Sequence, residues 1–188
     1  MPRAFLALFL IGSFSLSPAA RAQERKLTAA NLPEYLSRYQ QNFGFLEAAY
    51  GDLAIENVPL LNEQGKPLGR RLLEDRQKAL SELRQTVRQL AANPQDLVQT
   101  ITLFVRTEAL SDDLLELSQI AYDNDREELG KRFSDLQVTM EYNKSLLESH
   151  VLRLAAEKQA RIRQLEIENQ ELQRKLKEAA APAKSPGG

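Results

Sequence analysis

The fold is decided by the C-terminal part of the chain, residues 126 to 178, which reads REELGKRFSDLQVTMEYNKSLLESHVLRLAAEKQARIRQLEIENQELQRKLKE. This stretch has no proline, and Gly130 near its start is its one glycine, so nothing in it ends a helix. A continuous helix over these residues is roughly 80 Å long at about 1.5 Å per residue. A chain of 188 residues does not form a domain large enough to cover such a helix. We therefore predict an all-α protein, a small antiparallel helical bundle whose long C-terminal helix projects as a coiled-coil arm.

The long helix carries two apolar stripes that differ in phase. The first stripe recurs in steps of four and three residues and comprises Leu129, Phe133, Leu136, Met140, Asn143, Leu147, His150 and Leu154. A stripe of this kind occupies one helical face and predicts packing against the earlier helices. The second stripe begins at Ile162, eight positions after Leu154 and one more than a heptad. Such an offset rotates the stripe around the helix and predicts a different partner for the second half.

The second stripe resembles a short leucine zipper. Its predicted oligomerisation seam alternates heptad positions a and d and comprises Ile162, Leu165, Asn169, Leu172 and Leu176. In a parallel dimer, Arg161 at g and Glu166 at e are placed to form interhelical ion pairs. Asparagine at position a costs stability but fixes the register, so residues 155–178 are predicted to pair as a homodimer or with another coiled-coil protein. Ile167 at position f leaves open a broader seam that a third helix covers.

Three shorter helical segments precede the long helix. The apolar face of residues 30 to 53 comprises Leu32, Leu36, Tyr39, Phe43, Leu46, Tyr50 and Leu53. The stripe of residues 70 to 92 comprises Leu73, Leu80, Leu83, Val87 and Leu90. The third segment carries a broad apolar face that we place in the middle of the bundle, namely Leu97, Val98, Ile101, Phe104 and Val105. Together with the first half of the long helix, these segments predict a bundle domain over residues 30–154.

The connections between these segments contain helix-capping residues and one long loop. We predict Asn31 and Asn93 as N-caps of the first and third helices, because asparagine accepts the free N–H groups of a first turn. Asp125 is predicted to cap the long helix, with Glu128 as the return partner of a capping box. Two prolines and two glycines within residues 54–69 predict a loop or a small hairpin lying over the helices.

The N-terminus has the three parts of a secretory signal peptide. Arg3 precedes an apolar run over residues 4 to 16, and Ala20-Arg21-Ala22 supplies the small-residue pattern of a cleavage site. The run is shorter than the roughly 18 residues that span a bilayer, so we predict removal of residues 1–22 and no integral membrane segment afterwards. The protein is therefore expected to be exported to the periplasm or outside the cell, with a bacterial envelope favoured.

Two short segments flank the predicted folded region. Residues 23–29 are expected to form a flexible linker after cleavage. Residues 179–188, which are rich in alanine, proline and glycine, have no means of burying a core and are expected to be disordered. The chain has no cysteine, so no disulfide contributes to stability.

The composition limits the chemistry that the protein can carry out. With one histidine and no cysteine, the chain has no thiolate nucleophile and no multi-histidine metal site, and we predict no catalytic, metal-binding or cofactor-binding residues. His150 lies on the first stripe and is interpreted as a structural, partly buried residue. A net charge of −1 argues against nucleic-acid binding, which depends on clustered lysine and arginine. The helix before the zipper-like seam has mixed charge, so the DNA-binding role of zipper proteins does not follow from the resemblance.

These observations favour a nonenzymatic exported scaffold or adaptor that self-associates or docks a partner through its C-terminal coiled coil. An alternative interpretation is a periplasmic carrier or chaperone-like protein. Its apolar ligand or unfolded client would bind to the aromatic face formed by Tyr39, Phe43 and Tyr50.

Overall fold

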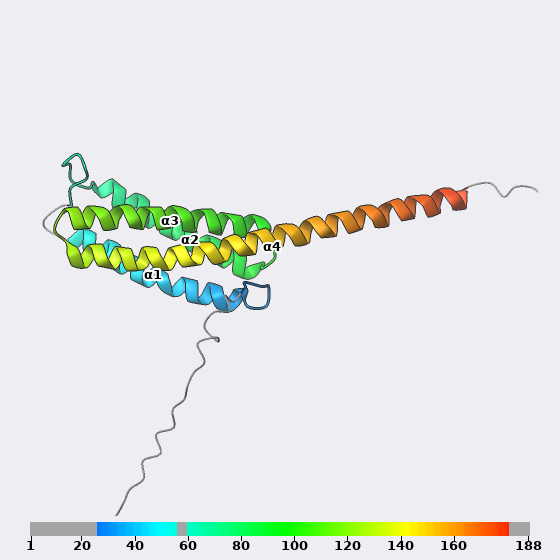
Figure 1. The fold of residues 1–188 in the computed structure, drawn as a ribbon, viewed down its shortest axis with the longest axis horizontal. Coiled ribbons are helices and arrows are strands. Elements are labelled where there is room, and N and C mark those ends of the chain that lie inside the picture. The colour runs from blue at the N-terminus through cyan, green and yellow to red at the C-terminus, as the bar shows by residue number, and fades with distance from the viewer. Residues whose placement is uncertain (1–25, 56–59, 181–188) are drawn as a thin grey trace, which may run out of the picture.

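The computed structural model describes residues 26–55 and 60–180, and these residues form four α-helices. The helices are α1 (Leu32–Ile55), α2 (Arg70–Ala92), α3 (Leu97–Asp123) and α4 (Glu127–Ala180). Figure 1 shows them gathered in a bundle, which α4 leaves as one continuous helix. The predicted all-α bundle with a long projecting C-terminal helix is confirmed. The predicted signal peptide and residues 181–188 lie outside the described residues.

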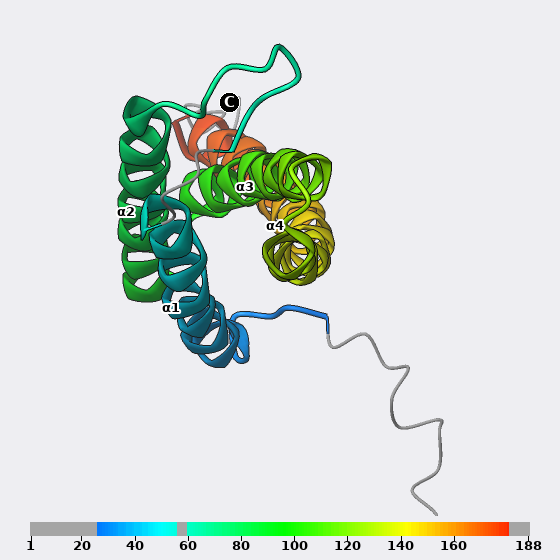
Figure 2. The same ribbon diagram turned by 90° about the vertical axis from the view of Figure 1, so that its left-hand side faces the viewer.

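Helices that are consecutive in the sequence pack against each other, and α4 also packs against α1. The most extensive packing in the bundle is between α3 and α4, while α1 packs against α2 and α4, and α2 packs against α3. Viewed along the bundle, α3 lies between α2 and α4 (Figure 2). One side of α4 is therefore occupied by α3 over most of the length of the bundle.

The core contains the stripes predicted for α1, α2 and the first half of α4. In α1, six of the seven predicted positions are at most 3% exposed, and Leu53 is half-buried. All eight first-stripe residues of α4 are buried, including Asn143 and His150. In α2, the predicted stripe is buried from Leu80 onward, whereas Leu73 near the start of the helix is half-buried. Helical periodicity thus identified these three faces correctly.

α3 buries a different face from the one predicted. Val98, Ile101 and Val105 are 69%, 40% and 51% exposed, so their placement in the middle of the bundle was wrong. The other two residues of the predicted face, Leu97 and Phe104, are half-buried. The buried face instead alternates leucines with small polar side chains and includes Thr100, Leu103, Thr107, Ser111, Leu114, Leu117 and Ser118.

The buried hydroxyl groups of α3 are tolerated because each has a hydrogen-bond partner. Thr100 donates to the carbonyl of Asp96 and Thr107 to the carbonyl of Leu103, both at 2.7 Å. Tyr39 lies 2.8 Å from the Thr107 hydroxyl, and Ser118 donates to the carbonyl of Gly130 at 2.9 Å. These bonds offset the desolvation of the hydroxyls. Small threonine and serine side chains therefore occupy the closely packed face of α3. A search for apolar residues alone does not find this face.

The N-terminus of α3 lies three residues later than predicted. Asp96 is its N-cap and accepts the backbone N–H of Gln99 at 3.0 Å. The prediction that Asn93 caps α3 was wrong, because Asn93 ends α2 and donates its backbone N–H to Gln89 at 3.1 Å. Asn93 therefore ends α2 and does not cap α3.

The turn between α3 and α4 is closed by backbone hydrogen bonds. Asp125 has a left-handed conformation with φ of 59°. Its N–H donates to Tyr122 at 3.1 Å, and the N–H of Arg126 donates to Ala121 at 2.9 Å, which is the Schellman pattern of a helix C-terminus. Asp125 therefore ends α3, and the prediction that it caps α4 was wrong.

Residues 60–69 form a small loop that is fixed to the α3–α4 turn. Leu61 and Pro67 form one antiparallel bridge, and the Asn62 side chain accepts the N–H groups of Gln64 and Lys66 at 3.0 and 2.9 Å. The Asn124 side chain both accepts from and donates to the backbone of Leu61, each at 2.9 Å. The loop therefore lies at the end of the bundle from which α4 starts, far from the projecting part of that helix (Figure 1).

Candidate interaction site

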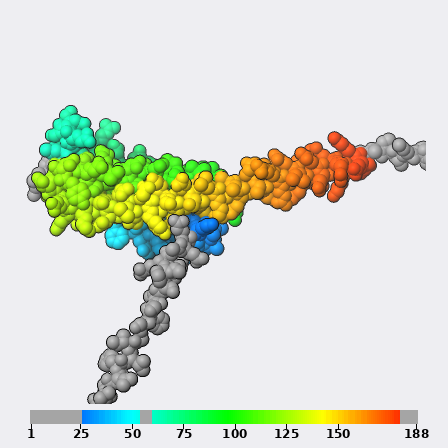
Figure 3. Space-filling model, viewed as in Figure 1, coloured from blue at the N-terminus to red at the C-terminus, as the bar shows by residue number. Residues whose placement is uncertain are grey.

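α4 leaves the bundle after Leu154. Leu154 is 4% exposed, whereas every residue from 155 to 179 is exposed. We call residues 155–180 of α4 the arm, which at about 1.5 Å per residue is roughly 40 Å long. Figure 3 shows the arm as a narrow rod extending from the body of the molecule. Among the described residues, no other segment covers it.

The arm carries all five residues of the predicted seam on a continuous helix. Its large aliphatic side chains are about half exposed or more, with values of 49% for Ile162, 46% for Leu165, 58% for Ile167, 59% for Leu172 and 69% for Leu176. Gln173 donates to the Asn169 side chain at 3.5 Å, a contact along the same helix. The structure therefore presents the seam as an unpaired apolar stripe with one polar residue at its centre.

Charged side chains flank the stripe and interact within the arm. Arg161 lies 3.8 Å from Glu168, which also accepts a hydrogen bond from Gln164 at 2.8 Å. Arg174 lies 3.6 Å from Glu178. Exposed pairs of this kind contribute at most about 1 kcal/mol each. They support the helix but leave its apolar side chains uncovered.

The base of the arm is tied to the N-terminal segment by His150 and Arg153. Leu27, which lies in the predicted linker, is 5% exposed, and its carbonyl accepts hydrogen bonds from Arg153 Nη2 at 2.8 Å and Nε at 3.2 Å. His150 Nδ1 lies 2.7 Å from Arg153 Nη2 and 3.2 Å from the Leu27 carbonyl. Nδ1 therefore contacts both a donor and an acceptor, and in a neutral ring it bonds with one of them.

His150 makes the stability of the bundle depend on pH. Burial lowers the pKa of His150, and the nearby Arg153 cation lowers it further, against the opposing effects of the Leu27 carbonyl and Glu157. The unfolded chain therefore binds the proton more readily, and stability is complete above the ordinary value of about 6.5 and falls as the pH drops below it. We expect the free energy of unfolding to fall by at most about 1.4 kcal/mol per pH unit from this group. Urea unfolding between about pH 7.5 and 5.5 tests this, since His150→Gln should show a flatter profile. Equal slopes for the two proteins would contradict the assignment.

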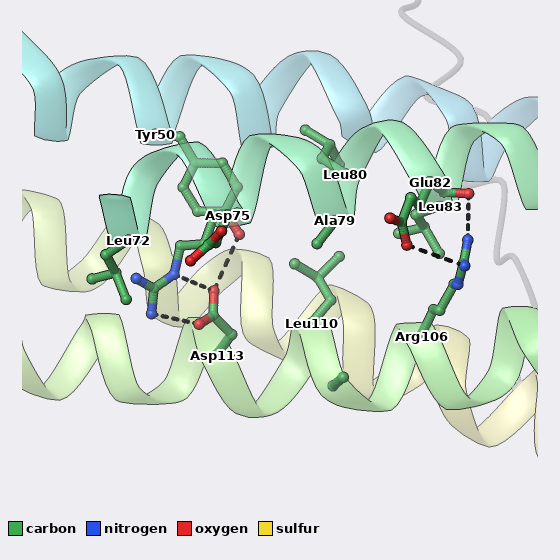
Figure 4. Close-up of a pocket in the computed structure, with 12 residues that line it drawn as sticks. Tyr50, Leu72, Asp75, Ala79, Leu80, Glu82, Leu83, Arg106, Leu110 and Asp113 are labelled. Carbon is green, nitrogen blue, oxygen red and sulfur yellow. Dashed lines mark hydrogen bonds and ion pairs between the residues drawn. The ribbon is translucent and has the colours of Figure 1, made fainter. Parts of the chain in front are cut away.

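A cavity of about 300 Å³ lies between α2 and α3, with α1 at one end. Its apolar walls comprise Leu72, Ala79, Leu80, Leu83, Ala109 and Leu110. Figure 4 shows Arg106 beside Glu82 at one end of the cavity, and Tyr50 and Asp113 approaching each other at the other end. Charged groups thus lie at both ends of an apolar space, which is open to solvent beside the exposed Ala79 and Ala109.

The charged group at the Tyr50 end includes a buried arginine. Arg76 is 7% exposed, and its Nε and Nη2 donate to the two carboxylate oxygens of Asp113 at 2.6 and 2.5 Å. The Tyr50 hydroxyl also donates to Asp113 at 3.4 Å, and burial together with the Asp113 charge raises the pKa of Tyr50. Among the described residues, Arg76 Nη1 is buried without a hydrogen-bond partner. Arg76 and Asp113 thus form a two-point ion pair across the α2–α3 interface.

The Arg76–Asp113 pair was not predicted from the sequence, although the sequence contains a signal for Arg76. Counting back four residues from Leu80 along the α2 stripe gives Arg76, which therefore lies on the buried face. An arginine at such a position predicts a buried acidic partner, because an unpaired buried charge is costly. No comparable periodicity identifies Asp113, which is adjacent to a second aspartate at position 112.

The three aromatic residues proposed as a ligand face lie in the core. Tyr39 and Phe43 are 1% and 3% exposed and contact each other with ring centroids 5.7 Å apart. Tyr50 is 2% exposed and, of the three, is the one that lines the α2–α3 cavity. Tyr50 also lines a second cavity, between α1 and α2, so it is the residue of the three that borders open space.

The part of the chain that the structure describes contains no group of three or more His, Asp or Glu side chains arranged to hold a metal ion. Within the same residues, no helix combines the length and apolarity needed to cross a bilayer. The fold and the exposed stripe define an all-α bundle protein with a helical arm. A scan against protein-family models, a search of curated proteins and a search of solved structures each returned no match.

Proposed function

We propose that this protein is a nonenzymatic scaffold or adaptor of an exported compartment, which self-associates through its arm. In this proposal, the bundle is a folded unit that holds the arm in a helical state. The arm supplies the contact surface. The exposed stripe from Ile162 to Leu176, on a helix that the bundle does not cover, is the observation that carries the proposal.

The energetic argument rests on the four aliphatic residues of the seam. Full burial of a leucine or isoleucine side chain contributes about 1.5–3 kcal/mol, so pairing of the stripe provides a substantial driving force. Most helical stability in proteins comes from tertiary packing, and the arm continues directly from a helix whose first half is packed in the core. The bundle therefore lowers the cost of presenting the stripe in helical form.

Truncation after Leu154 tests whether the arm is the association element. We expect the shortened chain to remain folded, because the core residues precede residue 155 in the sequence. It should also be monomeric, whereas the chain extending to residue 188 forms a larger species. Light scattering gives the mass, and thermal unfolding followed by circular dichroism reports the fold. A shortened chain that is folded and still associates would contradict the proposal.

The α2–α3 cavity supports a second candidate function, a carrier of small amphiphiles. Its volume is near the lower end of the range of about 300–1,000 Å³ that is common for ligand sites, and its walls are mostly apolar. Arg76 Nη1, buried without a partner among the described residues, provides a donor near one end. A molecule with a short apolar body and a carboxylate or carbonyl group matches these features.

A medium-chain fatty acid is a suitable probe for the carrier function. We expect it to raise the melting temperature of the chain and to remain bound in native mass spectrometry. Ala79→Phe, which fills the cavity, should abolish both effects. Arg38→Ala, a change at an exposed residue outside the cavity, is the control. No shift for the unaltered chain would remove the support for this candidate.

A further inference from the structure

We propose that the arm pairs with the arm of a second copy of this chain in an antiparallel orientation, with Leu165 of each copy facing Leu176 of the other. This inference rests on the proposed function, because it specifies the partner, direction and register of the same stripe. It is carried by the direction in which the stripe faces relative to α3 and by the charges beside it.

Three hydrogen bonds identify the edge of α4 that contacts α3. Ser118 of α3 donates to the carbonyl of Gly130 at 2.9 Å. Ser111 of α3 accepts from Gln137 at 3.4 Å and lies 3.2 Å from the Glu141 carboxylate. Gly130, Gln137 and Glu141 therefore lie on the side of α4 that α3 covers.

The seam of the arm is separated from these three residues by whole heptads or nearly so. Leu165 and Leu172 lie a whole number of heptads after Gln137, while Ile162, Asn169 and Leu176 lie whole heptads after Glu141. A straight helix drifts by about 20° per heptad, so over these three to five heptads the stripe turns by about 60–100°, from the α3 edge onto the buried side of α4. A helix that docks on the stripe therefore lies beyond the bundle, in line with the helices that pack against α4, which are α3 and α1. Figure 1 shows this space, where α4 continues past the end of α3.

A parallel dimer in register conflicts with this arrangement. In such a dimer, residues with the same number lie side by side, so the second copy's α4 continues past residue 155 along the side of the first α4. That side faces the bundle, where α3 and α1 pack against α4. Because α4 is one helix from Glu127 to Ala180, two bundles and two parallel arms do not fit without breaking it.

An antiparallel pair avoids the conflict because the second copy's helix ends before it reaches the first bundle. With Leu165 opposite Leu176, the second copy's Ala180 lies opposite Arg161. Residues 155 to 160 then separate the pair from the first bundle. Asn169 faces Leu172 of the second copy, and Ile162 faces its Ala179. Each of these layers pairs an a position with a d position, as antiparallel coiled coils require.

Charge complementarity selects this register over the next one. Glu168 and Lys175 both occupy position g, and the proposed register brings Glu168 of each copy beside Lys175 of the other, which gives two attractive pairs. A shift of the second copy by one heptad toward the first bundle instead places Glu168 beside Glu168. The same shift sets Lys158 opposite Leu176 in the seam. Like charges across an interface disfavour that arrangement.

The antiparallel pair has a consequence for what the protein does. Its two bundles lie at opposite ends of the paired arms, with the two Leu154 residues roughly 50 Å apart along the axis. The dimer is then a spacer that holds two identical bundles apart. A parallel pair would instead place both bundles at one end.

Cysteine cross-linking tests the direction and the register, and the natural absence of cysteine makes single substitutions unambiguous. We would prepare the chain from residue 23 as Leu165→Cys, as Leu176→Cys and as Gln170→Cys, an exposed control outside the seam. Each variant would be oxidised alone, and the first two would also be oxidised as an equimolar mixture. Sedimentation before oxidation establishes the mass, and circular dichroism establishes that each variant is folded.

We expect a disulfide-linked dimer in the mixture and little in any variant alone. In the proposed register, the two copies of position 165 are about 16 Å apart along the axis. This separation is beyond the roughly 7 Å between Cα atoms that a disulfide spans. Cross-linking of Leu165→Cys to itself would overturn the antiparallel orientation, and a dimer without the mixed disulfide would overturn the register. A monomeric mass before oxidation would overturn the proposed function as well, so the two failures are distinguishable.

Discussion

Replacing Asp113 with alanine is expected to lower the free energy of unfolding by about 3 kcal/mol, because it leaves the buried guanidinium with only the exposed Glu116 carboxylate, 3.9 Å away. Arg76 is 7% exposed and directs two of its donors to this carboxylate. The change also removes the acceptor of the Tyr50 hydroxyl. Chemical unfolding by urea gives the free energy directly.

Two further variants isolate the buried charge as the cause. Asp112→Ala changes the neighbouring, exposed carboxylate and is expected to alter stability by less than about 0.5 kcal/mol. Arg76→Met combined with Asp113→Leu replaces both charges with apolar groups and should recover most of the loss. If Asp113→Ala and Asp112→Ala had equal effects, the ion pair would not have the structural role assigned to it.

A charged residue placed in the seam is expected to weaken association strongly. Leu172→Asp puts a carboxylate opposite Asn169 in the proposed pair, where it has no cationic partner, and should weaken dimerisation by at least about 100-fold. Leu152→Asp is a matched control, because Leu152 is 66% exposed on the same helix but precedes the arm, whereas Leu172 is 59% exposed within it. Sedimentation velocity measures the dissociation constants of both variants. Equal weakening by the two substitutions would show that the effect is not specific to the seam.

The parts of the fold that the sequence predicted correctly are those where apolar residues form most of the buried face. α1 and the first half of α4 follow steps of four and three with few exceptions, and both stripes are buried. The length of α4 was also evident, because nothing between Arg126 and Glu178 ends a helix. In these segments, local periodicity and tertiary packing agree.

α3 shows where this reasoning fails. Both of its faces carry enough apolar or small residues to be buried, and the more hydrophobic one, with Val98, Ile101 and Val105, is exposed. The buried face is the one that packs closely against the neighbouring helices, where Thr100 and Thr107 donate their hydroxyls to backbone carbonyls one turn earlier. The sequence of one helix does not determine which of its faces packs against the other helices.

The candidate site was predictable in composition but not in orientation. The seam residues follow from heptad spacing, and the structure presents all five on an exposed helix. Their direction relative to α3 depends on which edge of α4 the bundle occupies, and this became apparent from the contacts of Ser111 and Ser118. These contacts are the reason why an antiparallel pair is proposed in place of a parallel zipper.

The mass of the unaltered chain from residue 23 onward tests the central claim, association through the arm, most directly. Sedimentation equilibrium across the micromolar range should give a mass that rises with concentration to about twice that of one chain. A mass equal to one chain at every concentration, in a protein with the helix content of the folded structure, would contradict the claim.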